Sequence, residues 1–215
     1  MTASSGRPRV AYQGAPGAFG EEAIARYWGG RAEPLDSATF DDVVTAVSSG
    51  VARYAVLPVW NSTIGRIDAA WAALEPRNAG MSRGLRVVGE LTFPIRHYLM
   101  GRPGVRSRSI DLVLGHPATL AQCGRYILAR GLRAIASGDS AGAARALASA
   151  ADDEPLEVPG TGETVDPRSC AVIAPAAAAS RYLLAVLACS VQNEPDNRTS
   201  FLVVEGGVAR EHARW

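Results

Sequence analysis

One hydroxyl near the C-terminus stands where a polar loop meets an apolar run. Thr199 follows Asn197 and Arg198, and the residues from Phe201 to Val204 predict a strand. The Thr199 side chain would therefore lie at the mouth of a sheet. A threonine hydroxyl is a poor acid, so in a closed cleft it would act through a preorganised hydrogen bond to a departing oxygen. The alternative is a hydroxyl that only stabilises the turn before the strand.

Other polar residues fall on predicted loops. Asn61 follows the apolar run Tyr54–Val59, and parallel α/β sheets collect ligands on such strand-to-helix loops. Helix capping is the alternative role, although Ser62 and Thr63 offer caps as well. A turn at Gly14-Ala15-Pro16-Gly17 precedes a predicted helix, whose free N–H groups are suited to receive a carboxylate.

Several kinds of chemistry are excluded by what the motifs lack. The turn at residues 14–17 has neither the Gly-x-Gly-x-x-Gly pattern of dinucleotide sites nor the Gly-Lys-Ser/Thr of a P-loop, so no cofactor is predicted. No Cys/His cluster has metal-ligand spacing, and no metal is expected. The chain has no lysine, which excludes Schiff-base catalysis by a lysine side chain.

The composition indicates a globular protein, since 47% of its 215 residues are hydrophobic. Its net charge of +1, without a long run of either sign, makes a nucleic-acid partner unexpected. About 18 consecutive apolar residues occur nowhere, so no membrane partner is expected. We expect a cytoplasmic protein in which Cys123, Cys170 and Cys189 are buried free thiols.

Short β-rich runs alternate with helical patterns, which favours βαβ units and mostly parallel sheets with helices on both faces. The pairs are Arg9–Gln13 with Phe19–Trp28, Tyr54–Val59 with Ile64–Leu74, Asp111–Leu114 with Ala118–Ala129, Arg133–Ala136 with Ala141–Ala150, and Ala171–Ala174 with Ala176–Leu184; Phe40–Ser49 adds a helix. Glu90–Met100 is a long extended run in which Pro94 cannot donate to a central ladder. We interpret it as a crossover to a second sheet, with a return near residues 190–197.

The segment 197–201 resembles the Asn-x-Thr-Arg-Phe motif of prephenate dehydratases, with Ser200 in place of arginine. Further segments resemble the same family in order and spacing: Gly14–Phe19, Tyr54–Gly65, Val88–Leu91, and His116-Pro117 through Gln122-Cys123. The resemblance covers roughly residues 8–205. It implies a two-lobed α/β fold, similar to type II periplasmic binding proteins, with two mainly parallel sheets and a central cleft.

The resemblance also implies a reaction and a domain layout. Prephenate dehydratases convert prephenate to phenylpyruvate with loss of water and carbon dioxide. Lobe I would comprise residues 1–92 and 190–215, and lobe II residues 93–189. After Phe201 only 14 residues remain, too few for the regulatory ACT domain that binds phenylalanine in most members. We therefore expect no such feedback domain, and a homodimer is expected by family analogy alone.

Site residues are carried over from the matching positions. Thr199 would assist departure of the C4 hydroxyl of the small-molecule substrate, with Asn61 and Gln122 as further catalytic residues. Substrate-binding residues would be Gly14, Ala15, Pro16, Trp60, Ser62, Thr63, His116, Pro117, Ser140, Ala141, Asn197, Ser200 and Phe201. The alternatives are an exposed helical glutamine at position 122, a structural histidine at position 116, and a helix cap at Ser140 or Asp139.

Three residues depart from the family pattern. Trp60 stands where glutamate is usual, Gly115 where serine is usual and Ser200 where arginine is usual. We interpret the first and last as the joint loss of an ion pair, with Trp60 filling the vacated volume and a more apolar cleft as the result.

Four functions remain in competition. The first is a prephenate dehydratase without the ACT domain, serving a specialised pathway. The nearest alternative is a non-aromatising prephenate decarboxylase, which the three departures favour and the retained Thr199 opposes. The others are a dehydratase of arogenate or a related cyclohexadienyl compound, and a catalytically decayed ligand-binding module.

Overall fold

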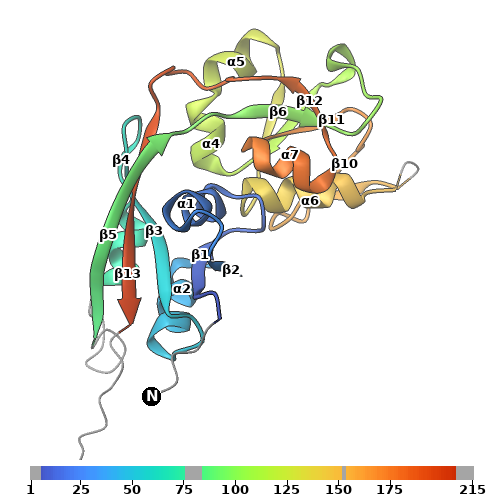
Figure 1. The fold of residues 1–215 in the computed structure, drawn as a ribbon. Helices are drawn as coiled ribbons and strands as arrows, with labels where there is room; N and C mark the ends of the chain where they lie inside the picture. The colour runs from blue at the N-terminus through green and yellow to red at the C-terminus, as the bar shows by residue number, and fades with distance from the viewer. Residues whose placement is uncertain (1–5, 76–83, 152–153, 207–215) are drawn as a thin grey trace, which may run out of the picture.

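Two β-sheets form the framework of the molecule, and helices pack around them (Figure 1). The computed structural model describes residues 6–75, 84–151 and 154–206. The strands of the first sheet are, in order, β2 (Glu33–Ser37), β1 (Arg9–Gln13), β3 (Tyr54–Asn61), β13 (Arg198–Gly206) and β5 (Leu85–Pro94), with β4 (Gly65–Arg66) paired to β3. Those of the second are β12 (Ala185–Ala188), β6 (Tyr98–Gly101), β11 (Cys170–Ala174), β7 (Leu112–Gly115) and β8 (Arg133–Ala136). A separate ladder joins β9 (Leu156–Glu157) and β10 (Thr164–Val165).

Both large sheets are mixed. The parallel parts are β2-β1-β3 and β11-β7-β8. β13 is antiparallel to β3 and β5 because it brings the chain back from the second sheet, and β6 is antiparallel to both of its neighbours. The two-sheet α/β fold is therefore confirmed, whereas the sheets are not mainly parallel.

The chain passes between the sheets twice. It leaves after Pro94, which ends β5 on the edge of the first sheet, where its missing N–H group removes no central ladder bond. It returns between β12 and β13, along residues 189–197. The division into residues 1–92 with 190–215 and residues 93–189 stays a prediction.

Most helices lie where the sequence predicts them: α1 (Phe19–Trp28), α2 (Phe40–Ser48), α6 (Ser140–Ser149) and α7 (Ala176–Tyr182), beside a short 3-10 helix at Ser107–Ser109. The helix expected from Ile64 begins only at α3 (Asp68–Leu74), because Gly65 and Arg66 pair back onto β3. The helix expected at Ala118–Ala129 is divided at Cys123 into α4 (Pro117–Gln122) and α5 (Gly124–Ala129).

The start of α2 is fixed by a capping box. The Thr39 side chain accepts a hydrogen bond from the Asp42 N–H, and the Asp42 carboxylate accepts one from the Thr39 N–H. Val43, Val44 and Val47 then bury the apolar face of this helix against the first sheet. The cap thereby sets where the first turn of α2 stands.

Burial distinguishes the three free cysteines. Cys123 and Cys170 are buried, and burial raises the pKa of each thiol to about 12, so both stay protonated and unreactive. Cys189 is exposed, which makes the expectation of a buried thiol wrong for this residue.

No helix of the described part is long enough to cross a membrane, since the longest, α1 and α6, have 10 residues each.

Leu183 is held in the left-handed backbone region, with φ 56°, directly after α7, and its side chain is 79% exposed. This conformation costs a non-glycine residue about 1–2 kcal/mol. Leu183→Gly is therefore expected to raise the free energy of unfolding by about 1 kcal/mol in urea titrations. Leu128→Gly is the control: Leu128 is 83% exposed but helical, where glycine costs about 1 kcal/mol. Equal destabilisation of both variants would contradict the strain at Leu183.

Candidate active site

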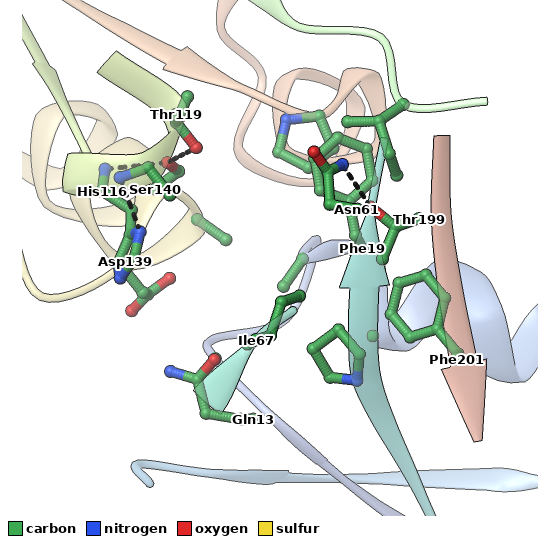
Figure 2. A pocket seen from close by; sticks show the side chains of 18 of the residues that line it. Gln13, Phe19, Asn61, Ile67, His116, Thr119, Asp139, Ser140, Thr199 and Phe201 are labelled. Carbon is green, nitrogen blue, oxygen red and sulfur yellow. Dashed lines mark hydrogen bonds between the residues drawn. The ribbon is translucent and has the colours of Figure 1, made fainter. Parts of the chain in front are cut away.

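A cavity of about 460 Å³ lies between the two sheets. Asn61 and Thr199 line one side of it and His116, Asp139 and Ser140 the other, as Figure 2 shows. We call these two sides the strand wall and the helix wall. Val56, Pro58 and Phe201 add apolar surface to the strand wall, Thr119 and Gln122 lie on the second-sheet side, and Ile95 and His97 come from the first crossing segment. The cavity is thus built by both halves of the fold.

A β-bulge in β3 turns Asn61 into the cavity. Opposite β13, Ser200 pairs with Trp60 and Phe201 with Pro58, so Val59 is an extra residue. Side chains alternate along a strand, so with regular pairing Asn61, which is three residues after Pro58, would face away from the side that Pro58 faces. The carbonyl of Val59 is not left unpaired, because it accepts hydrogen bonds from the Trp71 indole (3.0 Å) and the Ile67 N–H (3.1 Å).

The orientation of the Asn61 amide is set by backbone groups that only donate. Its Oδ1 accepts hydrogen bonds from the N–H groups of Thr63 (2.9 Å) and Ile64 (3.2 Å). Its Nδ2 must therefore be the donor to Thr199 Oγ1, at 2.8 Å. Because Thr199 Oγ1 accepts this bond, the hydroxyl hydrogen points elsewhere, and it has no acceptor among the described residues. Thr199 can therefore donate to a ligand in the cavity.

A chain of buried hydrogen bonds continues from Asn61 toward the second sheet. Asn61 Nδ2 donates to Asn197 Oδ1 (2.8 Å), and Asn197 Nδ2 donates to Gln122 Oε1 (2.8 Å). The same Gln122 oxygen bonds His97 Nε2, also at 2.8 Å. All four side chains are buried. Such a bonded polar cluster holds the partner of Thr199 in one geometry.

The helix wall brings a serine, a histidine and an aspartate together without the bonds of a hydrolytic triad. His116 Nδ1 accepts the Ala118 N–H (3.2 Å), so in the neutral ring Nε2 carries the hydrogen. Burial lowers the pKa of His116, and Asp139 partly opposes that shift. Ser140 Oγ accepts the His116 backbone N–H (3.0 Å) and donates to Thr119 Oγ1 (3.2 Å). A triad serine would instead bond the imidazole.

The charged side chains that line the cavity, within the described residues, are two carboxylates. Asp139 caps α6 by accepting the Gly142 N–H (2.7 Å), and its Oδ1 lies 3.4 Å from the Ala15 N–H of the first turn. Asp41 stands in the first turn of α2. Among the described residues no arginine lines the cavity, so the positive potential there comes from N–H groups, among them the His116 Nε2–H.

A family model described as prephenate dehydratase matches residues 10–207. The chain belongs to this family. Arogenate dehydratase 1 from Petunia hybrida is 36% identical over 199 residues, which cover 91% of this chain and 42% of that protein. The protein called arogenate dehydratase/prephenate dehydratase 6, chloroplastic, from Arabidopsis thaliana is 36% identical and is covered to 43%. The chain thus spans less than half the length of these relatives.

Two solved structures share the fold. A prephenate dehydratase from Arthrobacter aurescens in complex with L-Phe has a TM-score of 0.74 at 24% identity, covering 94% of this chain and 61% of that one. A protein described as GqqA, a novel type of quorum quenching acylase, also has a TM-score of 0.74, at 28% identity, with coverages of 94% and 65%.

The family positions fall into two groups in the structure. Gly14, Asn61, His116, Gln122, Ser140, Ala141, Thr199 and Phe201 line the cavity. Ala15, Pro16, Trp60, Ser62, Thr63, Pro117, Asn197 and Ser200 do not. Several of these serve indirectly: Thr63 orients the Asn61 amide, and Asn197 links Asn61 to Gln122. Direct substrate contact by the second group stays a prediction, since these residues lie outside the lining of the cavity.

None of the three departures from the family pattern is at a residue that lines the cavity. Trp60 and Ser200 are register partners on the face of the sheet opposite Thr199, where Trp60 is 47% exposed and Ser200 Oγ lies 2.7 Å from Thr92 Oγ1. Gly115 is buried against Leu120 and the Ile173 carbonyl. Trp60 therefore fills no volume in the cleft, and the expected gain in apolar character is wrong as far as these residues are concerned.

His97, Asp41 and Thr119 line the cavity although the sequence did not single them out for the site. The residues that hold His97 in place, Gln122 and Gln192, are distant in the chain. One signal was present: His97 directly follows the run through Pro94 that predicts a crossover, and a crossing segment must pass between the halves of the fold.

Proposed function

We propose that this protein removes water and carbon dioxide from a cyclohexadienyl substrate, either prephenate or its amino-acid counterpart arogenate. The observation that carries the proposal is the Thr199 hydroxyl, which accepts from Asn61 at 2.8 Å and keeps its hydrogen for a ligand in a cavity between two lobes. Family membership supports the same reaction class.

The reaction needs a departing oxygen to be stabilised. The bond from C1 to the ring carboxylate breaks, carbon dioxide leaves, and the electron pair enters the ring. The C4–O bond breaks with its own electron pair, and one proton taken up from solvent completes water. A hydrogen bond from Thr199 to the C4 oxygen strengthens as negative charge builds there, so it lowers the barrier rather than only tightening binding.

The two walls match the two ends of the substrate. In prephenate and arogenate the C4 hydroxyl and the three-carbon side chain stand at opposite ends of the ring. The strand wall offers the Thr199 hydroxyl, and the facing helix wall offers the Ser140 backbone region, the His116 Nε2–H and Asp139 (Figure 2). The apolar surface of Phe201 and Pro58 on the strand wall would hold the ring.

The charge of the cavity favours arogenate over prephenate. Prephenate carries two carboxylates and no cation, whereas arogenate adds an ammonium group on the side chain. Asp139 and Asp41 are the charged side chains in the described lining, and they are suited to an ammonium group. The names of the plant relatives, which include arogenate dehydratase, agree with this preference.

Asp139→Asn tests the substrate preference. The amide oxygen can still cap α6, so the fold should be kept, while the charge that faces the ammonium group is lost. We expect kcat/KM for arogenate to fall about 5- to 10-fold and that for prephenate to stay unchanged or rise, since a partly exposed charge contributes about 1 kcal/mol. Equal loss for both substrates would show that Asp139 acts on the fold and not on the amine.

Product analysis separates the competing functions. With prephenate or arogenate, a dehydratase gives phenylpyruvate or phenylalanine together with carbon dioxide. A non-aromatising decarboxylase releases carbon dioxide and keeps the hydroxyl, and a ligand-binding module gives no product. An acylase activity, which the name of one structural neighbour suggests, is opposed by the lack of a hydrogen bond between Ser140 and the His116 ring. Absence of any aromatic product would refute the proposal.

Location and assembly remain predictions. The Arabidopsis relative is called chloroplastic, which describes that protein, and the cytoplasmic location and homodimer expected here rest on the sequence and the family alone. Sedimentation of the purified protein measures the second.

A further inference from the structure

His97 carries a buried ring nitrogen, Nδ1, that has no hydrogen-bond partner among the described residues. His97 is 2% exposed and lines the cavity. In the described part of the chain, every other buried side-chain nitrogen and oxygen has a hydrogen-bond partner. A buried polar atom without a partner costs about 1–3 kcal/mol, so its persistence calls for a function.

The tautomer of His97 follows from bonds that start at the backbone. The N–H groups of Thr63 and Ile64 fix Asn61 Nδ2 as a donor, so the Asn197 atom that it meets is the acceptor Oδ1. Asn197 then presents Nδ2 to Gln122 Oε1, which makes that oxygen an acceptor as well. His97 Nε2 must therefore donate to it.

The neutral ring consequently bears its lone pair on Nδ1. Burial lowers the pKa of His97 below its ordinary value, and the bond to Gln122 opposes this only in part, which keeps the ring neutral near pH 7. Its neighbours are uncharged: Phe19 from α1, Gln122 from α4 and Gln192 from the returning segment. The charged or titratable groups elsewhere on the cavity are Asp41 on α2, Asp139 before α6, and His116 before α4.

We propose that His97 Nδ1 accepts a hydrogen bond from the C4 hydroxyl of the substrate. This inference rests on the proposed dehydratase function. The prephenate dianion has one hydrogen-bond donor, the C4 hydroxyl, and the hydroxyl end of the substrate belongs beside Thr199, which the Asn61, Asn197 and Gln122 cluster connects to His97. A lone pair without a protein donor and a substrate with a single donor are complementary.

The contact would position the departing oxygen. With its hydrogen held by Nδ1, the C4 hydroxyl presents a lone pair to the Thr199 hydroxyl, whose hydrogen bond strengthens as negative charge builds on the oxygen. The Phe19 ring packs against His97 in a T-shaped arrangement, with ring centroids 5.5 Å apart, and Phe19 lines the same cavity. Entry of the substrate would displace Phe19 and bring the hydroxyl to Nδ1.

Two isosteric variants separate this role from a structural one. In His97→Gln the side-chain amide can occupy the place of Nε2 and keep the bond to Gln122, but nothing accepts at the place of Nδ1. In His97→Asn an oxygen can stand near the place of Nδ1, and the bond to Gln122 is lost. We expect His97→Gln to lower kcat/KM about 10- to 100-fold for both prephenate and arogenate, and His97→Asn to remain about 10-fold more active than His97→Gln.

A purely structural histidine would give the reverse order, and that order would overturn the proposal. Loss confined to arogenate would also overturn it, because the contact would then be to the ammonium group. Thermal unfolding of each variant checks that the fold is kept. If the wild-type protein forms no aromatic product, the dehydratase function itself fails; if it does and His97→Gln is fully active, only the role of His97 fails.

The pH dependence of kcat/KM gives an independent readout. Protonation of Nδ1 destroys the acceptor, so wild-type activity should fall on the acid side, at a pH below the ordinary pKa of histidine. His97→Asn should lose this acid limb, since its amide does not titrate. Activity that instead falls as the pH rises through this region would mean that Nδ1 acts as an acid, and the acceptor role would be wrong.

Discussion

Thr199→Val should lower kcat for aromatisation about 10²- to 10³-fold while leaving the fold intact. Valine keeps the branched shape of threonine and removes the hydroxyl that would face the departing oxygen. The fold should survive because Asn61 Nδ2, which carries two hydrogens, still has two acceptors, Asn197 Oδ1 at 2.8 Å and the Arg198 carbonyl at 3.0 Å. No buried donor is left unpaired.

The measurement is the rate of phenylpyruvate or phenylalanine formation, with the melting temperature of each variant recorded beside it. Thr199→Ser is the matched control, since it keeps the hydroxyl and loses the methyl group, and it should retain part of the activity. Ser200→Ala removes the neighbouring hydroxyl, which lies outside the cavity against Thr92, and should be nearly silent. A fully active Thr199→Val variant would remove Thr199 from the mechanism.

Asn61→Asp should lower the free energy of unfolding by about 2–4 kcal/mol at pH 7 and remove most activity. The substitution keeps an oxygen for the Thr63 and Ile64 N–H groups and replaces the donor by a carboxylate oxygen. That oxygen would face acceptors at 2.8 to 3.0 Å, among them Thr199 Oγ1 and Asn197 Oδ1. Thr199 would then turn its hydrogen toward the carboxylate and away from the ligand.

The effect of Asn61→Asp should depend on pH in a defined direction. Burial among acceptors would raise the pKa of the new carboxyl above its value in the unfolded chain, about 3.9. The protonated carboxyl is a donor, so stability matches the wild type most closely below that value and is lost as the pH rises through the raised pKa. Urea unfolding of both proteins from pH 4 to 8 measures this, and a pH-independent difference would contradict the donor role of Asn61.

Much of the architecture could be predicted from the sequence. Alternating strand and helix patterns gave the α/β class, and Pro94 in a long extended run gave the passage to a second sheet, because a proline is tolerated there only at an edge. The hairpin of β3 and β4 was missed: it depends on Gly65 at φ 78° and on backbone pairing, whereas the residues from Ile64 to Leu74 have a helical pattern.

Which residues form the site could be predicted better than the direction in which their side chains point. Alternation along β13 already implies that Ser200 faces away from Thr199 and Phe201, so its exclusion from the cavity could have been foreseen. The outward position of Trp60 and the inward position of Asn61 could not, because regular alternation from Pro58 predicts the reverse and the bulge at Val59 shifts it. His97 required the partners that folding brings from distant segments.

That extra residue has a consequence for how relatives are compared. Deleting Val59 would leave Pro58, Trp60 and Asn61 in regular one-to-one pairing with β13, so all three side chains would keep the faces that they have now. A relative that lacks this residue can therefore present the same amide and the same hydroxyl to the chamber. A one-residue gap at this position in an alignment is not by itself a sign of lost activity.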